Sequence, residues 1–294
     1  MELNLTSPKT VRNLLNEYSL APLKSKGQNF LIDGNIAEKT ARAAIPEGAF
    51  ALEIGPGLGA LTQRLLARAG KVFAYEIDSG LVRALREIFA GESRLSLMHE
   101  DFLKADIESD LAETAQQGIY VAASLPYYIT TDCILKLLDS RLNIKSITVI
   151  VQKEFADKAC ARPGDKDYCA LSAACSLSSD ARILFTVPPG CFYPEPKVGS
   201  AALGMRINEA EKEETKERLS LVKALFSARR KTVKNNLQSA FGLRAEEAQD
   251  ILKDSGIDIN ARAENLSVIE IKKLHKNLKS ASKYTENRLK SFKQ

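Results

Sequence analysis

The stretch LEIGPGLGAL, residues 52–61, carries the pattern that decides the fold. It begins in a short apolar run and leads into the helix-like segment Ala60–Ala69. Between the two stand Gly55, Gly57 and Gly59, which let a backbone turn sharply and approach a ligand closely. The stretch therefore predicts a strand, a tight turn and a helix, with a ligand site at the turn.

The same alternation of strand-like and helix-like patterns continues to about residue 190. Short apolar runs bounded by Gly, Pro or polar residues predict strands at 50–54, 71–77, 95–99, 119–124, 147–151 and 183–187. Helix-like stretches between these runs include Ala60–Ala69, Ser79–Ala90 and Thr131–Ser140. This order is typical of an α/β fold, in which a mostly parallel sheet is covered by helices on both faces. We expect the proline-rich segment 188–200 to be an irregular loop and 201–207 to be a closing edge strand.

After about Asn208 the strand patterns stop and helical patterns dominate. In the segment 226–241, Phe226, Val233, Leu237 and Phe241 fall within one stripe of a helix. We therefore expect two domains, a ligand-binding α/β domain over 1–207 and a small helical domain over 208–294.

The composition is that of an ordinary globular protein, with 294 residues, 45% hydrophobic and 27% charged. The sequence contains no apolar run approaching the ~20 residues of a membrane span, and its N-terminus lacks the pattern of a signal peptide. The five cysteines form no CxxC pair, and there are only two histidines. We expect a reduced cytoplasmic protein with neither a disulfide framework nor a metal site.

The positive charge is concentrated in the helical domain. Residues 211–294 contain 19 Lys or Arg against 12 Asp or Glu, which leaves residues 1–210 slightly acidic. The segment 271–294 has eight basic residues and one acid. Such a segment indicates either a polyanion partner or a solvated, lysine-rich helix, and charge alone does not separate the two.

Two acids follow the glycine loop at the ends of the next two predicted strands. Glu76 lies 21 residues after Gly55, where a carboxylate can accept both hydroxyls of a ribose. Asp101 follows the third strand and can accept from the exocyclic amine of an adenine. The glycine spacing is GxGxG and the loop holds no Lys or Arg, which favours S-adenosylmethionine over a dinucleotide. The alternative is a structural turn beside two solvated acids.

The tetrapeptide Ser124-Leu125-Pro126-Tyr127 ends the fourth predicted strand and should face the same crevice as those acids. A side-chain oxygen at 124 and the Leu125 carbonyl can accept from the exocyclic amine of a base and orient its lone pair towards a methyl donor. Pro126 fixes the turn, Tyr127 offers a flat face to a flipped base, and Phe192 could form the other side. The alternative is a strand-ending turn with a buried tyrosine, but the neighbouring cofactor pattern favours the site.

These residues resemble the KsgA/RsmA family of small-subunit rRNA adenine N6-dimethyltransferases over nearly the whole chain. The matching segments are GQNFL (27–31), EIGPGLGALT (53–62), YEID with Glu76, EDF with Asp101, LPYYITT (125–131), QKE (152–154), FYPEPKV (192–198), RRKTVKNNL (229–237) and RAENLS (262–267). The last two separate this family from the Erm methyltransferases of the large subunit. The resemblance implies a Rossmann-like methyltransferase sheet followed by a small all-helical domain.

The resemblance also implies the substrate and the residue roles. Two adjacent adenines in the 3′-terminal hairpin of 16S rRNA, within the immature small subunit, would each receive two methyls, and the enzyme would act as a monomer. The implied contacts to S-adenosylmethionine come from Asn29, Leu31, Gly55, Gly57, Glu76, Asp101 and Ser124. The implied RNA contacts come from the basic helices, at Arg229, Arg230, Lys231, Lys234, Lys272, Lys273 and Lys276.

Three positions depart from the family pattern. Ser124 stands where the family usually has Asn, Gly199 where it usually has Asp, and Cys169 where it usually has Gly. Loss of one aligned acceptor at 124 would cost roughly 1–3 kcal/mol in the transition state. The sequence thus leaves three hypotheses: an active dimethyltransferase slowed by Ser124, a binding factor that checks subunit assembly with little catalysis, and an Erm-like enzyme of the large subunit.

Overall fold

The computed structural model describes residues 3–22, 28–112, 117–209, 212–228 and 230–281. They divide into two compact units, one of residues up to 156 together with 180–207, the other of 157–179 together with those from 208 onward. The expected division after residue 207 recurs here. Our assignment of 157–179 to the first domain is wrong, because Tyr168, Ala173 and Leu177 belong to the hydrophobic core of the helical unit.

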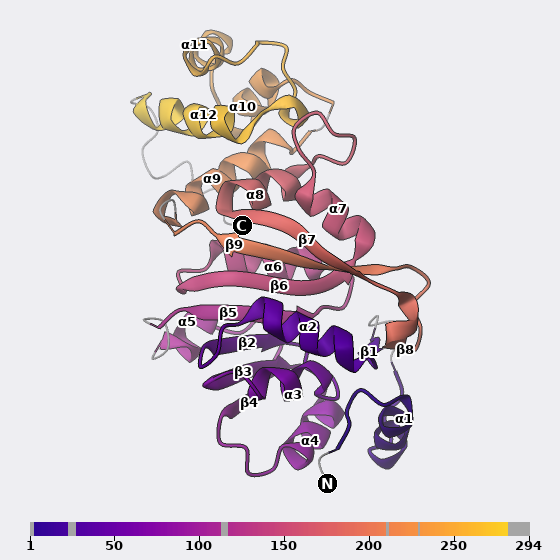
Figure 1. Ribbon diagram of the computed structural model, residues 1–294. Helices are drawn as coiled ribbons and strands as arrows, with labels where there is room; N and C mark the ends of the chain where they lie inside the picture. The colour runs from indigo at the N-terminus through magenta and orange to yellow at the C-terminus, as the bar shows by residue number, and fades with distance from the viewer. Residues whose placement is uncertain (1–2, 23–27, 113–116, 210–211, 229, 282–294) are drawn as a thin grey trace. The chain divides into compact units, whose positions relative to one another are not determined.

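A seven-stranded sheet forms the centre of the first unit (Figure 1). Its order is β4 (Leu95–His99), β3 (Lys71–Glu76), β2 (Phe50–Ile54), β5 (Ile119–Ser124), β6 (Ile144–Gln152), β9 (Ser200–Ile207) and β7 (Ser179–Val187). The first five strands are parallel. Because β2 is flanked by β3 and β5, the chain reverses its direction of winding there, which is where α/β sheets open a crevice for ligands.

The strand expected to close the sheet lies inside it. β9 pairs antiparallel with β6 from Ser146↔Arg206 to Gln152↔Ser200 and separates β6 from β7. Seven of its eight residues are wholly or partly buried, whereas every residue of β7 between its two buried ends is exposed or half-buried, as in an edge strand. The expectation of an edge strand at 201–207 is therefore wrong, and β7 is the edge.

Helices cover both faces of the sheet, with α2 (Gly34–Ala44) and α3 (Ala60–Leu66) in front and α6 (Thr130–Asp139) behind in Figure 1. α4 (Ser79–Ile88) packs on β3 and β4. Acidic side chains cap α2 and α4 at the turns that precede them; the Asp78 carboxylate, for example, accepts from the amides of Gly80 and Leu81 at 2.9 and 3.1 Å. The described part of this unit also contains α1 (Pro8–Glu17), α5 (Ile107–Asp110) and the first part of α7 (Lys153–Cys160).

A second, two-stranded sheet joins distant parts of the chain. β1 (Phe30–Leu31) pairs antiparallel with β8 (Phe192–Tyr193), so that Leu31 lies opposite Phe192. β8 and the short 3-10 helix Pro189–Cys191 lie in the segment that we expected to be irregular. This pairing brings the segment around Asn29 beside the loop that carries Phe192.

The helical unit contains α8 (Ala170–Ser178), α9 (Lys212–Leu225), α10 (Val233–Phe241), α11 (Ala245–Ser255) and α12 (Val268–Ser280). α10 begins only at Val233, because Thr232 caps it by accepting from the Asn235 amide. The expected single helix over 226–241 is therefore wrong. Val233, Leu237 and Phe241 still share the buried face of α10, and Phe226 packs against the same core from the end of α9.

Among the described residues, no helix is both long and apolar enough to cross a membrane. The five cysteines, all within the described ranges, are free thiols. In the same part of the chain, no group of three or more His, Cys, Asp or Glu side chains is placed to hold a metal ion.

Candidate active site

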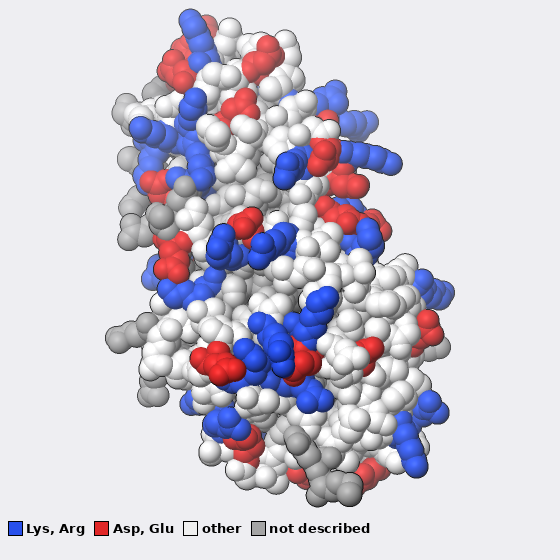
Figure 2. Space-filling view, viewed as in Figure 1, with Lys and Arg blue, Asp and Glu red and all other residues white. Residues whose placement is uncertain are grey.

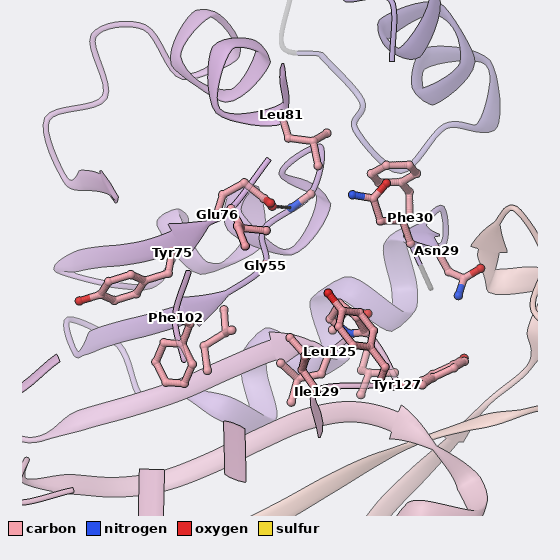
Figure 3. A pocket seen from close by; sticks show the side chains of 18 of the residues that line it. Asn29, Phe30, Gly55, Tyr75, Glu76, Leu81, Phe102, Leu125, Tyr127 and Ile129 are labelled. Atoms are coloured by element: carbon pink, nitrogen blue, oxygen red, sulfur yellow. Dashed lines mark hydrogen bonds between the residues drawn. The ribbon is translucent and has the colours of Figure 1, made fainter. Parts of the chain in front are cut away.

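A cavity of about 250 Å³ opens at the carboxyl ends of β2, β3 and β5 (Figure 3). Ten of the eleven site residues predicted in the first unit line it: Asn29, Gly55, Gly57, Glu76, Asp101, Ser124, Leu125, Pro126, Tyr127 and Phe192. Among the described residues, its lining contains Glu76, Glu100 and Asp101 but no Lys, Arg or His. The cavity therefore suits a ligand that carries hydroxyl, amine or cationic groups, and its described lining offers no positive charge to a phosphate.

The glycine loop makes its turn through left-handed conformations. Gly55 and Gly57 have φ angles of +67° and +62°, which L side chains rarely adopt. A Cβ on Gly57 would come within 3.2 Å of the Phe30 ring, whereas a Cβ on Gly55 would meet nothing within 4 Å. Gly57 is thus needed to let Phe30 pack on the loop, and Gly55 leaves open space beside the cavity.

Glu76 is 5% exposed and is held by backbone amides at the end of β3. The Gly57 amide donates to its Oε2 at 3.2 Å, and the Asp78 amide donates to its Oε1 at 3.0 Å. Burial raises the pKa of Glu76, while these amides act in the opposite direction. The carboxylate is therefore fixed before any ligand arrives, with remaining lone pairs for the two hydroxyls of a ribose.

Asp101 begins a turn in the segment after β4. Its Oδ1 accepts from the Leu103 amide at 3.0 Å, and its carbonyl accepts from the amides of Lys104 and Ala105. Among the described residues, no side chain or amide donates to Oδ2. Because the half-buried Asp101 lines the cavity, Oδ2 is available to an amine there.

The opposite wall is built by the strand end at Ser124 and the turn that follows. Figure 3 shows Leu125, Tyr127 and Ile129 across the cavity from Gly55 and Glu76. Thr130 Oγ1 and the Ile129 amide both donate to the Pro126 carbonyl, which closes the turn into α6. The half-buried Ser124 lines the cavity, and its hydroxyl has no partner among the described residues.

The Tyr127 ring is anchored at its far end. Its hydroxyl lies 3.0 Å from Ser200 Oγ, and either oxygen could be the donor. Ser200 is 1% exposed and begins β9, where it pairs with Gln152. The hydroxyl end of the ring is therefore held by the sheet, and Ser200 is a site residue that no sequence motif identified.

The two-stranded sheet supplies a further side of the cavity. Asn29 and Phe30 line it directly, as Figure 3 shows. Phe192 lines it as well but is only 4% exposed, so most of the ring belongs to the hydrophobic cluster around β1. Leu31, the eleventh predicted residue, does not line this cavity; it borders a smaller one, of about 40 Å³, beneath the glycine loop.

Glu53 borders that smaller cavity together with Asn29 and Ser124. It is 1% exposed, and its Oε2 has no hydrogen-bond partner among the described residues. Burial, with a smaller contribution from the nearby Glu76 carboxylate, raises the pKa of Glu53 to about 8. Glu53 is not among the predicted site residues, although an acid inside the otherwise apolar run 50–54 is a signal in the sequence that could have identified it.

The residues predicted to bind RNA lie in the helical unit. Lys272, Lys273 and Lys276 are on α12, Lys234 is on α10, and Arg230 and Lys231 precede α10; all are exposed or half-exposed. Arg229 lies outside the described residues. On the face seen in Figure 2, acids are interspersed among the basic side chains of these helices, so that the viewed surface is not of a single sign.

Asn236, in the motif RRKTVKNNL, has a role that the sequence did not reveal. It is 1% exposed, and its Nδ2 donates to the carbonyls of Leu225 and Ala228 at 2.6 and 3.3 Å. These bonds fix the turn between α9 and α10, just before Arg230 and Lys231. Asn236 therefore sets the backbone from which these two basic side chains project.

A basic cluster is also visible over α2 and α3 in Figure 2. On α2 and just after α3, Arg42 contacts Glu38 at 2.5 Å and Arg68 contacts Glu47 at 3.7 Å. These two basic side chains are therefore engaged in ion pairs with neighbouring acids.

The buried Glu53 should make the stability of the ligand-free protein depend on pH. Its folded pKa of about 8 lies above the ordinary value of 4.5, so its contribution is fully present below pH 4.5 and is lost as the pH rises towards 8. The slope for one proton is about 1.4 kcal/mol per pH unit. We expect Glu53→Gln to remove roughly 2 kcal/mol of the decline in unfolding free energy between pH 6 and 8, as measured with urea.

The exposed Glu47 provides the control, because Glu47→Gln removes a carboxylate whose side chain is 82% exposed. This variant should decline with pH as the wild type does. If Glu53→Gln also declined in parallel with the wild type, Glu53 would not be the group that titrates.

The sequence has close relatives among curated proteins. It matches the family described as Ribosomal RNA adenine dimethylase over residues 23–280. A protein of Alkaliphilus oremlandii called Ribosomal RNA small subunit methyltransferase A is 39% identical over 281 residues, covering 93% of this chain and 98% of the relative. The protein of that name from Shouchella clausii is 40% identical and covers 93% of this chain and 96% of the relative.

Solved structures show the same architecture. A dimethyladenosine transferase from Plasmodium falciparum aligns with a TM-score of 0.70 at 26% identity, over 83% of this chain and 95% of the other. The 23S rRNA methyltransferase ErmE aligns with a TM-score of 0.62 at 26% identity, over 86% of this chain and all of the other. These matches confirm the expected Rossmann-like methyltransferase fold. With the family match covering most of its length, the chain belongs to the ribosomal RNA adenine dimethylase family.

Proposed function

We propose that this protein transfers methyl groups from S-adenosylmethionine to N6 of two adjacent adenines in the 3′-terminal hairpin of 16S rRNA, late in assembly of the small subunit. The observation that carries the proposal is that Ser124, Leu125 and Tyr127 line the same cavity as Glu76 and Asp101. A site for a methyl donor and a site for a base amine thus share one space. The curated relatives, which are named for the small subunit, favour 16S rRNA over the 23S substrate named for ErmE.

The cavity fits the proposed cofactor. The open space at Gly55 leaves room across the strand end, the fixed Glu76 carboxylate would hold the ribose, and Asp101 Oδ2 would accept from the adenine amine. The unpartnered Oε2 of Glu53, in the smaller cavity beside Asn29 and Ser124, suits an ammonium group. When bound, S-adenosylmethionine supplies an electrophilic methyl on a sulfonium centre.

The protein's own contribution to the reaction is to orient the target amine. The lone pair of an exocyclic adenine nitrogen is delocalised into the ring. The Ser124 hydroxyl and the Leu125 carbonyl would accept the two N–H groups, which turns the lone pair out of the ring plane and towards the donor. Tyr127, held through Ser200, would provide the stacking face, and Phe192 would limit the space on the other side.

The helical unit would supply most of the affinity for RNA. Lys234 and the three α12 lysines project from helices whose opposite faces are buried in one core, and Arg230 and Lys231 project from the turn before α10. Such side chains bind the phosphate backbone without reading its sequence. We propose that the protein acts as a monomer in the cytoplasm and engages the rRNA within the immature small subunit.

The first test concerns Ser124, the position at which members of the KsgA/RsmA family usually carry Asn. Asn extends its acceptor further into the cavity than Ser does. We expect the wild type to dimethylate small subunits that lack the modification, and Ser124→Asn to raise kcat about tenfold to a hundredfold, the equivalent of one aligned acceptor. The measurement is methyl transfer from labelled S-adenosylmethionine, with the products mapped on the rRNA.

Ser124→Ala provides the matched control, because it removes the hydroxyl and adds no bulk. Its rate should fall below that of the wild type. If the wild type transferred nothing while Ser124→Asn did, the protein would be a binding factor for the small subunit that has lost one acceptor. Methyls found on 23S rRNA alone would contradict the proposed substrate.

A second prediction concerns the hydrogen bond between Tyr127 and Ser200. Tyr127→Phe and Ser200→Ala each remove this bond and keep the aromatic ring. We expect each variant to lower kcat about fivefold and to leave cofactor affinity unchanged. A fivefold change in rate corresponds to the loss of one hydrogen bond worth about 1 kcal/mol. Because both remove the same bond, the double variant should be no slower than either single variant.

Ser146→Ala is the matched control, since it removes a serine hydroxyl that donates to the Ala44 carbonyl at the end of α2, away from the cavity. It should not change kcat. Additive losses in the Tyr127 and Ser200 variants would mean that the two side chains act independently.

A third prediction concerns the α12 lysines. Replacing Lys272, Lys273 and Lys276 by Gln should reduce the slope of log K for RNA binding against log salt by roughly 0.7–0.9 for each phosphate that is no longer neutralised. Filter binding to small-subunit rRNA across a salt series measures that slope. Lys279→Gln is the control on the same helix, because Lys279 already donates to Glu217 at 2.9 Å. An unchanged slope in the triple variant would make α12 a solvated helix that does not bind RNA.

A further inference from the structure

Lys136, on α6, occupies an unusual position behind the cavity. Its Nζ donates to three main-chain carbonyls, those of Phe102, Leu103 and Ala105, at 2.7, 3.0 and 2.6 Å. An ammonium group has three N–H donors, so all three are used on one short segment of backbone. Neither the sequence motifs nor the proposed chemistry of the site accounts for this arrangement.

The segment that Lys136 binds is the turn that begins at Asp101. At one end of this turn, Asp101 Oδ1 accepts a hydrogen bond from the Leu103 amide, and the Asp101 carbonyl accepts from the amides of Lys104 and Ala105. At the other end, the carbonyls of Phe102, Leu103 and Ala105 have no partner within the turn and accept hydrogen bonds from the Lys136 ammonium. A cation at the carbonyl end and a carboxylate at the amide end both stabilise the aligned peptide dipoles of a single turn.

The turn is also fixed from its side. Phe102 is 4% exposed, and its ring packs edge-on against Tyr75 with the ring centroids 5.7 Å apart. Lys136 Nζ lies 5.3 Å from the centroid of the same Phe102 ring. Partial burial lowers the pKa of Lys136, while Asp101, Cys133, Glu100 and Asp106 act in the opposite direction. An ammonium held among three carbonyls and several acids has little freedom to move.

We propose that Lys136 is a positioning residue for the cofactor's adenine: it holds the turn 101–105 so that Asp101 Oδ2 faces the cavity. This inference rests on the proposed function, in which Asp101 accepts from the adenine amine. Without the cation, three carbonyl oxygens would lose their hydrogen-bond donor. The turn would then relax, and Asp101 Oδ2 would no longer face the cavity. Lys136 would thus act on adenine recognition without touching the cofactor.

The test compares the affinities of two ligands, measured by calorimetry on the full-length protein. One ligand is S-adenosylhomocysteine, and the other is its analogue with hydrogen in place of the adenine amine. The wild type should bind the first about tenfold more tightly, as expected for a hydrogen bond to a carboxylate. Lys136→Met should reduce this preference to near one, as Asp101→Ala should, and the double variant should lose nothing further.

Lys104→Met is the matched control, because Lys104 lies in the same turn but is exposed. It should keep the wild-type preference. Should Lys136→Met not fold, Lys136→Gln retains two N–H donors and should give an intermediate preference. A general loss of stability would weaken both ligands equally and leave the ratio unchanged.

The outcomes separate the two proposals. If the wild type did not distinguish the two ligands, the proposed role of Asp101 would fail, and the role of Lys136 would fail with it. If the wild type distinguished them and folded Lys136→Met did so equally well, the role of Lys136 would be overturned while that of Asp101 stood.

Discussion

The hydrogen bond from the Gly57 amide to Glu76 Oε2 is the contact on which the rest of the site depends. It joins the loop after β2 to the end of β3, and so converts two neighbouring strand ends into one wall. The bond requires a left-handed turn at Gly57, and the absence of a side chain there lets the Phe30 ring approach the loop. Phe30 in turn belongs to β1, whose pairing with β8 brings Phe192 to the cavity.

The electrostatics of the cavity follow from the same geometry. Glu53 and Glu76 are both buried, and among the described residues no cation lines either of the two cavities that they border. Removing water from a carboxylate without supplying a cation raises its pKa and makes its charged form costly. Amides offset this cost at Glu76, whereas one oxygen of Glu53 has no partner among the described residues. The protein is thus prepared for a ligand that brings hydroxyls to one acid and positive charge to the other.

Much of this arrangement could be predicted from the sequence, because the strand ends of a parallel sheet converge and are punctuated by glycine, acids and proline. That logic placed Gly55, Glu76, Asp101 and Ser124 around one crevice. It could not reveal contacts that depend on tertiary pairing. The two-residue strands β1 and β8 are too short to show a period. Ser200 comes to the cavity from β9, and Lys136 binds the turn after Asp101 from α6.

Dependence on tertiary contacts also explains why the edge strand, the assignment of residues 157–179 and the single helix over 226–241 were predicted wrongly. Local patterns give no sign that β9 inserts between β6 and β7, since both strands are apolar runs of similar length. Residues 157–179 read as part of the α/β alternation, yet Tyr168 donates to the Leu266 carbonyl 98 positions away and is buried in the helical core. The break before α10 is fixed by the Thr232 cap and by Asn236, and neither residue disturbs the apolar stripe that suggested one helix.

The three departures from the family pattern differ in consequence because of where their backbones lie. Cys169 has φ and ψ angles of −154° and −176°, an extended conformation that any residue adopts. A side chain on Gly199 would meet nothing within 4 Å. Both positions therefore tolerate the change without strain. Ser124 is different, because it lines both cavities and ends the strand that faces the glycine loop. A change of side-chain length there leaves the fold intact and alters the distance to whatever amine enters, so that among the three departures the chemical consequence is concentrated at this residue.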